Sequence, residues 1–141
     1  MKKSYYIDTC IYLNLWQKEV INGFKVWKVA KDFFEMIEDN NFIIYYSGFV
    51  FKELMYLLTK DEFINKKIMF ESSPYFKKII LSKEEFKEAR WIEKEVKYKI
   101  SFFDIIHMLL AKKTNSILIT RDNQLLALSK KYNVEAKKPE Y

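Results

Sequence analysis

The sequence contains few of the residues that build tight turns and covalent cross-links. Among its 141 residues there are two glycines, two prolines and one cysteine. So few turn residues argue against a turn-rich β-sandwich and favour long helices. Because Cys10 is the single cysteine, no disulfide can form within the chain, and we expect a reducing, cytoplasmic environment.

Long apolar segments are also missing from the sequence. The longest uncharged run, residues 40–51, is well short of the roughly 20 residues that a membrane-spanning helix needs. The N-terminus passes from Met-Lys-Lys directly into Ser4, with no apolar stretch of signal-peptide length. We therefore expect a soluble protein that is not exported and has no membrane partner.

Apolar and basic residues, in contrast, are plentiful. Half of the residues are apolar and 18% are aromatic, which argues against intrinsic disorder. A domain of this length buries roughly 70% of its unfolded surface, enough for a hydrophobic core without metals or disulfides. The 25 Lys and Arg residues exceed the 19 Asp and Glu residues, giving a formal charge of +6 that weakly favours polyanionic partners such as nucleic acid.

Short β-prone runs alternate with amphipathic stretches along the whole chain. We predict strands over residues 4–7, 42–46, 78–81, 117–120 and 134–136. We predict helices beginning at Asp8-Thr9 and over residues 24–39, 48–59, 61–71, 82–99, 101–111 and 122–131. No repeat or Gly/Ser/Pro-rich linker divides the sequence, so we expect residues 1–141 to form one domain. The alternation predicts a three-layer α/β/α sandwich with a central, mainly parallel sheet.

Serine residues mark the predicted starts of three of these helices. Ser47 ends a strand and is expected to cap the helix that follows. Ser82 and Glu85 have the spacing of a capping box. Ser101 opens a helix that is apolar almost all round, which we therefore expect to be buried.

Four carboxylates differ from the other acids, which lie among lysines on predicted helix surfaces. Asp8 directly follows the first predicted strand, and Asp122 follows the strand at 117–120 by two residues. Ligands of parallel sheets bind at the carboxyl ends of the strands, so we expect both acids at this edge of the sheet. Glu53 and Asp104 interrupt apolar helical segments, on faces that should point toward the core.

A cluster of buried carboxylates requires compensation of its charge. Two unit charges about 4 Å apart repel by about 4 kcal/mol at an effective dielectric constant of 20, so clustered acids either take up protons or bind cations. Oxygen ligands without a set of His and Cys residues select Mg²⁺ or Mn²⁺ over zinc. One or two such ions can activate a water molecule and stabilise the leaving oxygen of a phosphodiester.

Each of these carboxylates also has a structural alternative. Asp8 and Asp122 precede predicted helices and can act as caps, and Asp104 has capping-box spacing from Ser101. Glu53 lies in the middle of a helix, where capping is excluded but a buried ion pair with a lysine is not. The alternatives stay open for each acid taken alone, although all four would have to hold by coincidence.

Several motifs together resemble the PIN domain family, which includes the VapC-type toxin ribonucleases. Residues 6–9, Tyr-Ile-Asp-Thr, resemble the opening strand and Asp-Thr motif of that family. Residues 47–54 resemble its Ser-x5-Glu-Leu segment, and residues 119–122 resemble its Thr-Arg-Asp motif. Residues 104–111 resemble its buried helix that starts with Asp, and residues 134–141 resemble its final strand and Pro-Glu-aromatic ending.

The resemblance implies a metal-dependent endoribonuclease with a PIN-like fold. The acids that would bind Mg²⁺ or Mn²⁺ and carry catalysis are Asp8, Glu53, Asp104 and Asp122. The hydroxyl groups that would orient these carboxylates are those of Thr9, Ser47 and Thr120. The resemblance further implies a homodimeric toxin that acts on RNA and is neutralised by a VapB-type antitoxin. Cys10 departs from the small polar residue of many relatives, and residues 61–99 match no motif of the family.

Other residues near the motifs receive more ordinary interpretations. His107 lies one helical turn after Asp104 and is expected to be buried in the core or to support the site. Arg121 and Lys52 adjoin two of the acids and either contact phosphate or face solvent. Cys10 has no histidine nearby in the sequence, so we do not expect a nucleophilic role. The lack of a Gly-rich phosphate loop argues against an NTPase.

Other functional classes stay open at the level of the sequence. A non-catalytic PIN-like module would bind RNA through its basic surface, and its acids would be ordinary polar groups. A PIN nuclease that processes RNA would share the chemistry without acting as a toxin. A phosphoacceptor receiver-like domain ranks last, because no adjacent acidic pair follows the first strand and no suitably placed Lys follows the last major one.

Overall fold

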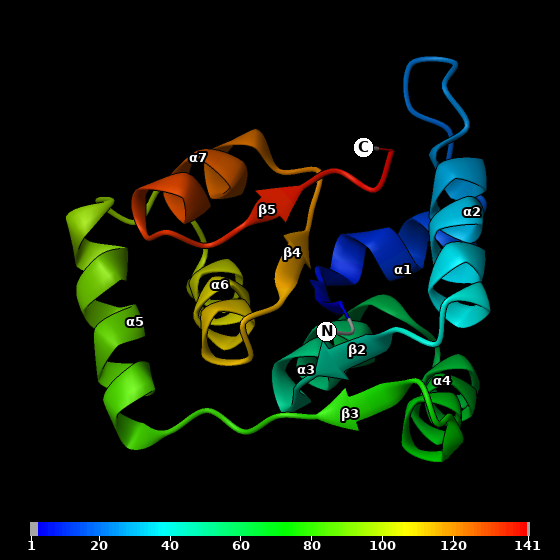
Figure 1. Cartoon of the computed structure of the whole chain (residues 1–141), viewed down its shortest axis with the longest axis horizontal. Helices are drawn as coiled ribbons and strands as arrows, with labels where there is room; N and C mark the ends of the chain where they lie inside the picture. The colour runs from blue at the N-terminus through cyan, green and yellow to red at the C-terminus, as the bar shows by residue number, and fades with distance from the viewer. Residues whose placement is uncertain (1–2, 141) are drawn as a thin grey trace.

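A parallel sheet of five strands forms the centre of the computed structural model, which describes residues 3–140 (Figure 1). The strand order is β3-β2-β1-β4-β5, and each neighbouring pair is parallel. The strands are β1 (Ser4–Ile7), β2 (Ile43–Tyr46), β3 (Phe76–Lys78), β4 (Ile117–Ile119) and β5 (Ala136–Lys137). The expected α/β fold with a central parallel sheet is therefore confirmed.

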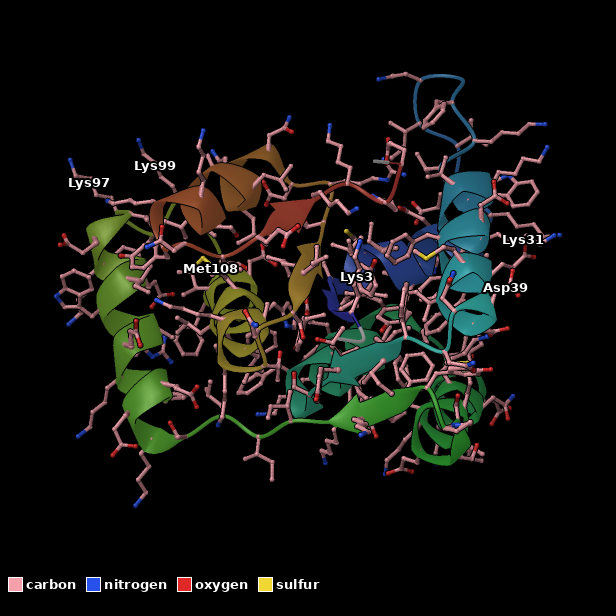
Figure 2. The ribbon with its side chains drawn as sticks, in the orientation of Figure 1. Lys3, Lys31, Asp39, Lys97, Lys99 and Met108 are labelled. Atoms are coloured by element: carbon pink, nitrogen blue, oxygen red, sulfur yellow. The ribbon has the colours of Figure 1, made fainter. Side chains whose placement is uncertain are left out.

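Helices cover both faces of this sheet. They are α1 (Thr9–Trp16), α2 (Val26–Asp39), α3 (Gly48–Leu57), α4 (Lys60–Ser72), α5 (Lys83–Glu95), α6 (Phe102–Lys113) and α7 (Asn123–Lys131). In Figure 1, α1, α2 and α4 lie on one side of the sheet and α5, α6 and α7 on the other, as right-handed crossovers require. Figure 2 labels two residues that show the inner and outer sides of the helices: Met108 of α6 is buried, whereas Lys31 of α2 points to solvent. Within residues 3–140, no helix has both the length and the apolar character needed to cross a bilayer.

Three serine side chains fix the starts of α3, α5 and α6. Ser47 Oγ accepts a hydrogen bond from the backbone N–H two residues later, at 3.3 Å. Ser82 and Glu85 form a reciprocal capping box, with distances of 3.2 and 2.8 Å. Ser101 Oγ accepts from the N–H of Asp104 at 3.1 Å. The caps expected at these serines are confirmed, because each hydroxyl satisfies a helix N–H that would otherwise lack a partner.

The centre of the sheet positions the residues that follow β1 and β4. β1 is hydrogen bonded to β2 on one side and to β4 on the other. Directly after β1, the Asp8 N–H donates to the Ile119 carbonyl at 2.9 Å, so the chain stays paired until it enters α1. Asp8 and Thr120 therefore lie next to each other at the carboxyl edge of the sheet.

The third strand lies earlier in the chain than the strand predicted at 78–81. Phe76 opens β3, and its ring packs 4.7 Å from the ring of Phe70, measured between centroids. Ile80, in the apolar run that favoured the later position, is 73% exposed. The predicted position was wrong because burial of one aromatic side chain, rather than the local apolar run, fixes the strand.

Non-glycine residues in the left-handed conformation end α5 and α7 and shift two predicted boundaries. Lys97 and Tyr98 have φ angles of 55° and 59°, so α5 ends before the predicted boundary at Lys99. Asn133, with φ of 59°, follows α7 and delays β5 beyond the predicted start at Val134. Helix ends of this type are usually marked by glycine, which is absent at all of these positions, and the boundaries were therefore misplaced.

A cluster of aromatic side chains joins α4 to the sheet and to α1. Its centre is Phe70, which is 1% exposed. The Phe70 ring lies within 6.3 Å, between centroids, of the rings of Tyr12, Trp16, Tyr46, Phe51 and Phe76. Edge-to-face contacts of this kind add to the free energy gained by burying the rings. Phe70 is the buried residue of α4 and thus attaches this helix to the core.

We expect Phe70→Ala to lower the free energy of unfolding by about 3–5 kcal/mol, because it leaves a cavity at the centre of the aromatic cluster. Urea denaturation followed by circular dichroism measures this change. Ile80→Ala is the matched control, since Ile80 is 73% exposed and its loss should change stability by no more than about 0.5 kcal/mol. Equal effects of the two substitutions would contradict the central position of Phe70.

Candidate active site

Asp8 is buried at the carboxyl edge of the sheet and is held by two neighbours. Its side chain is 5% exposed, and its Oδ2 accepts hydrogen bonds from Thr120 Oγ1 at 2.7 Å and from Cys10 Sγ at 3.4 Å. Burial and the charge of Asp8 raise the pKa of the Cys10 thiol, so this group stays protonated and acts as a donor. Although Asp8 precedes α1, its side chain makes no capping hydrogen bond. Helix capping therefore does not explain this carboxylate.

Glu53 projects from the middle of α3 toward the same region. Its Oε1 accepts hydrogen bonds from Thr9 Oγ1 at 2.9 Å and from His107 Nε2 at 2.5 Å. The Glu53 side chain is 23% exposed, whereas His107 on α6 is fully buried. The buried ion-pair partner left open by the sequence is thus a histidine and not a lysine.

A chain of hydrogen bonds connects His107 to the interior. The Tyr6 hydroxyl lies 2.7 Å from His107 Nδ1 and 2.7 Å from Ser47 Oγ. Burial raises the pKa of Tyr6 well above its usual value, so the phenol stays protonated. In the imidazolium form, His107 donates to Glu53 and to the Tyr6 oxygen, and the Tyr6 hydroxyl in turn donates to Ser47. Each polar group in this buried chain then has a partner.

The charge state of His107 follows from its surroundings. Burial alone lowers the pKa of the imidazole, but the hydrogen bond with Glu53 and the nearby carboxylates more than offset it, and the net shift is upward. A protonated His107 neutralises part of the negative charge that gathers at this edge. The interpretation of His107 as a buried supporting residue is confirmed by its burial and contacts.

Asp104 lies in the first turn of α6 and is half-buried. Burial, followed by the charge of Asp8, raises the pKa of Asp104 to about 6 from an ordinary value of 3.8. The charge of Glu53 adds to this rise, while His107 and the Ser101 hydroxyl oppose it. Asp8, Glu53 and His107 are thus the charged side chains that act on Asp104.

Asp122 follows β4 and is engaged in a different way. Its Oδ1 accepts from the backbone N–H groups of Gln124 at 2.9 Å and Leu125 at 3.4 Å, which makes it the cap of α7. Its own N–H donates to Thr120 Oγ1 at 3.1 Å. Because that hydroxyl also bonds to Asp8, Thr120 connects the two acids. The cap expected as an alternative role for Asp122 is present, and it occupies one carboxylate oxygen.

The three hydroxyl groups expected beside the acids have unequal positions. Thr9 and Thr120 donate directly to Glu53 and Asp8. Ser47 contacts neither carboxylate; it caps α3 and reaches Glu53 only through Tyr6 and His107. The participation of Tyr6 was missed, because a tyrosine in a central strand is indistinguishable in sequence from an ordinary core residue. The one available signal was that a buried tyrosine hydroxyl needs a hydrogen-bond partner.

The hydrogen bonds leave one oxygen free on each of two key carboxylates. All bonds to Asp8 converge on Oδ2 and all bonds to Glu53 converge on Oε1. Within residues 3–140, neither Asp8 Oδ1 nor Glu53 Oε2 has a hydrogen-bond donor, and neither is among the buried atoms that lack a partner. A carboxylate with one oxygen fixed by the protein and one free is suited to ligate a cation.

The residues present fit a hard divalent cation. In the described part of the chain, no three Asp, Glu, His or Cys side chains converge into a ready-made metal cage. Mg²⁺ does not need one, since it is usually bound through one or two carboxylates and keeps several waters for contact with phosphate. The pKa of Asp104 is raised first by burial and then by the charge of Asp8, and a cation bound nearby would favour the ionised form of Asp104.

The sequence of residues 5–131 matches the family model of the PIN domain. The chain belongs to the PIN domain family. PIN domains are nucleases that generally use divalent metal ions, so this chain belongs with hydrolases of nucleic acid. Asp8 follows β1 and Asp122 follows β4 in this PIN domain, at the positions of the opening and Thr-Arg-Asp motifs.

Solved structures of other PIN proteins have the same fold. The structure of VapBC2 from Rickettsia felis, bound to a DNA fragment from their promoter, has a TM-score of 0.66 and 19% identity, covering 96% of this chain and 98% of that chain. FitAcB from Neisseria gonorrhoeae has a TM-score of 0.62 and 16% identity, covering 96% of this chain and 97% of that chain. No curated protein matches the sequence significantly. At these identities the structural matches establish the fold of the whole chain.

We expect metal-free Asp104→Asn to be more stable than the unsubstituted protein at pH 7 but not at pH 4. The pKa of Asp104 is about 6 in the folded protein, above its ordinary value of 3.8, so stability is lost as the pH rises through this window and the carboxyl ionises beside Asp8. The asparagine variant does not undergo this loss. Chemical denaturation in EDTA at the two pH values measures the difference.

The control for this experiment is Asp32→Asn, which removes an exposed acid on α2. This variant should show no gain that depends on pH. A gain for Asp104→Asn of equal size at pH 4 and pH 7 would show that its carboxyl is not crowded by other negative charges.

Proposed function

We propose that this PIN domain is a Mg²⁺- or Mn²⁺-dependent endoribonuclease that hydrolyses RNA phosphodiester bonds. The observation that carries the proposal is that hydrogen bonds fix one oxygen of Asp8 and one oxygen of Glu53 and leave the other oxygen of each without a donor in residues 3–140. The arrangement supports a site that is completed by a cation and a phosphate.

Each acid has a distinct part in the proposed mechanism. Asp8 and Glu53 would hold the cation through their free oxygens, and the half-buried Asp104 would add a third negative group. Asp122, with Oδ1 committed to the cap of α7, would contribute only Oδ2. Bound Mg²⁺ or Mn²⁺ would supply an activated water and stabilise the leaving oxygen of the phosphodiester.

The surrounding residues keep these carboxylates in place. Thr120 fixes Asp8, while Thr9 and His107 fix Glu53. The charge of His107 opposes the rise in the pKa of Asp104, although burial and the charge of Asp8 outweigh it. The formal charge of +6 favours RNA as the polyanionic substrate, with Lys and Arg residues guiding it to the site.

We further propose that the protein is the toxin of a VapBC-type pair, partnered by a VapB-type antitoxin in the cytoplasm. The similar fold of VapBC2, which is described with a DNA fragment from their promoter, supports this assignment. We propose a homodimer as well. The exposed apolar residues that support it lie at the end of α3 and on the adjacent α4: Met55, Tyr56, Leu57, Ile64 and Ile68.

We expect the purified protein to cleave structured RNA in the presence of Mn²⁺, and we expect cleavage to stop when EDTA is added. Asp8→Asn should lower the cleavage rate at least about 100-fold, because it removes a proposed metal ligand. Thr120→Val should lower the rate about 10-fold, because it removes the hydroxyl that orients Asp8. Asp32→Asn is the control and should retain the normal rate. Gel analysis of labelled RNA measures all four proteins.

Cleavage that persists in EDTA and in Asp8→Asn would contradict a metal-dependent nuclease. RNA affinity without any cleavage would favour a non-catalytic PIN-like binding module. Growth arrest on expression, abolished by Asp8→Asn, would separate a toxin from a PIN nuclease that processes RNA without harm to the cell.

A further inference from the structure

Arg121 is held between two partners and has one buried donor left over. Its Nε donates to Asn14 Oδ1 at 3.2 Å, and its Nη1 donates to Glu140 Oε2 at 2.9 Å. Its Nη2 is buried and has no acceptor among residues 3–140. A buried charged donor without a partner is costly, and such groups are rare in folded proteins. The Arg121 side chain as a whole is 16% exposed, so an acceptor oxygen from a ligand reaches Nη2 only when the groups that cover this atom shift.

Arg121 lines a pocket of about 430 Å³ whose polar groups favour an anion. Lys138 and Asn123 line it as well, and Glu140 contributes its only negative charge within the described residues. Two cationic side chains thus face one carboxylate. Guanidinium groups bind phosphate oxygens through two parallel N–H groups. A carboxylate bound to one nitrogen leaves other N–H donors of the guanidinium for such contacts.

An apolar hairpin forms the opposite wall of this pocket. Ile21 and Phe24 exchange two backbone hydrogen bonds of 2.9 Å. Asn22 and Gly23 between them have φ angles of 50° and 78°, the tight turn that an Asn-Gly pair favours. The turn presents the Phe24 side chain, which is 49% exposed, beside the cationic groups. An aromatic face next to a phosphate site is suited to a ribose or base.

The pocket is connected to the acids along the chain. Arg121 directly follows Thr120, whose hydroxyl bonds to Asp8, and directly precedes Asp122. Asn123 in the pocket wall is the first residue of α7, the helix that Asp122 caps. Consecutive residues therefore join the pocket wall to Asp8 and Asp122.

We propose that this pocket is a subsite for a backbone phosphate of the RNA substrate, bound by Arg121 and Lys138, with Phe24 against the adjoining nucleoside. The inference rests on the proposed ribonuclease function and extends it to substrate binding. In the free protein, the Glu140 carboxylate holds Arg121 in place and competes with the phosphate for the guanidinium. RNA binding must displace or share this contact, so Glu140 weakens affinity for RNA.

The competition gives opposite expectations for two substitutions. Arg121→Gln should weaken the binding of a short single-stranded RNA about tenfold, whereas Glu140→Gln should strengthen it about threefold. Arg121→Gln should also reduce the slope of log affinity against log salt concentration by about 0.7, the value for one lost phosphate contact. Fluorescence anisotropy in EDTA measures binding without cleavage. Arg90→Gln is the control, because Arg90 also forms an ion pair, with Glu93, but lies outside the pocket.

If Arg121 has only a structural role, the expected results for the same variants differ. Loss of the ion pair would then lower the melting temperature of both the Arg121 and the Glu140 variants, with no gain of RNA affinity in Glu140→Gln and no change in salt slope. That result, or the absence of RNA binding by the unsubstituted protein, would overturn the proposal. If Arg121→Gln fails to fold, Glu140→Gln alone decides, because only competition for phosphate predicts tighter binding.

Failure of the subsite can be told apart from failure of the ribonuclease proposal. Asp8→Asn should bind RNA with unchanged dependence on Arg121 and yet not cleave it. Cleavage that depends on Asp8, together with equal RNA affinity of the Arg121 and Glu140 variants, would overturn the subsite alone. Arg121-dependent binding without any metal-dependent cleavage would overturn the nuclease and leave the subsite as a binding element.

Discussion

Repulsion between the carboxylates of Asp8, Glu53 and Asp104 is the constraint around which this edge of the protein is organised. The chain does not relieve it by separating the acids. It adds one buried cation, His107, and fixes single carboxylate oxygens with Thr9, Thr120 and Cys10. The pKa of Asp104 is still raised, first by burial and then by the charge of Asp8, and a divalent cation would lower it.

The fold supplies the rigidity that this crowding needs. Tyr6 in the central strand carries the hydrogen-bond chain from His107 to the cap of α3, so the helix that bears Glu53 and the strand that leads to Asp8 are connected through buried groups. Such a chain of hydrogen bonds holds charged groups in position only if every polar group in it has a hydrogen-bond partner. Its burial beneath the site also separates it from the surface where RNA would bind.

The sequence predicted which segments form helices and strands better than it predicted which side chains contact one another. The parallel sheet followed from alternating patterns, and the serine caps from local spacing. Capping explains Asp122 but not Asp8, and nothing within a few residues of either distinguishes them. Glu53 was recognised as unusual on its apolar face, yet its partner His107 lies 54 positions away, and only the packing of α3 against α6 brings them together. Arg121, Asn14 and Glu140 likewise meet through tertiary structure alone.

Anomalous diffraction from crystals soaked in Mn²⁺ addresses the shared cation directly, without relying on activity. The carboxylates with free oxygens predict a strong manganese peak in contact with both Asp8 and Glu53, and its loss in crystals of Asp8→Asn. A peak bound elsewhere, or no peak at Mn²⁺ concentrations that support RNA cleavage, would contradict the view that these acids are held together for a metal.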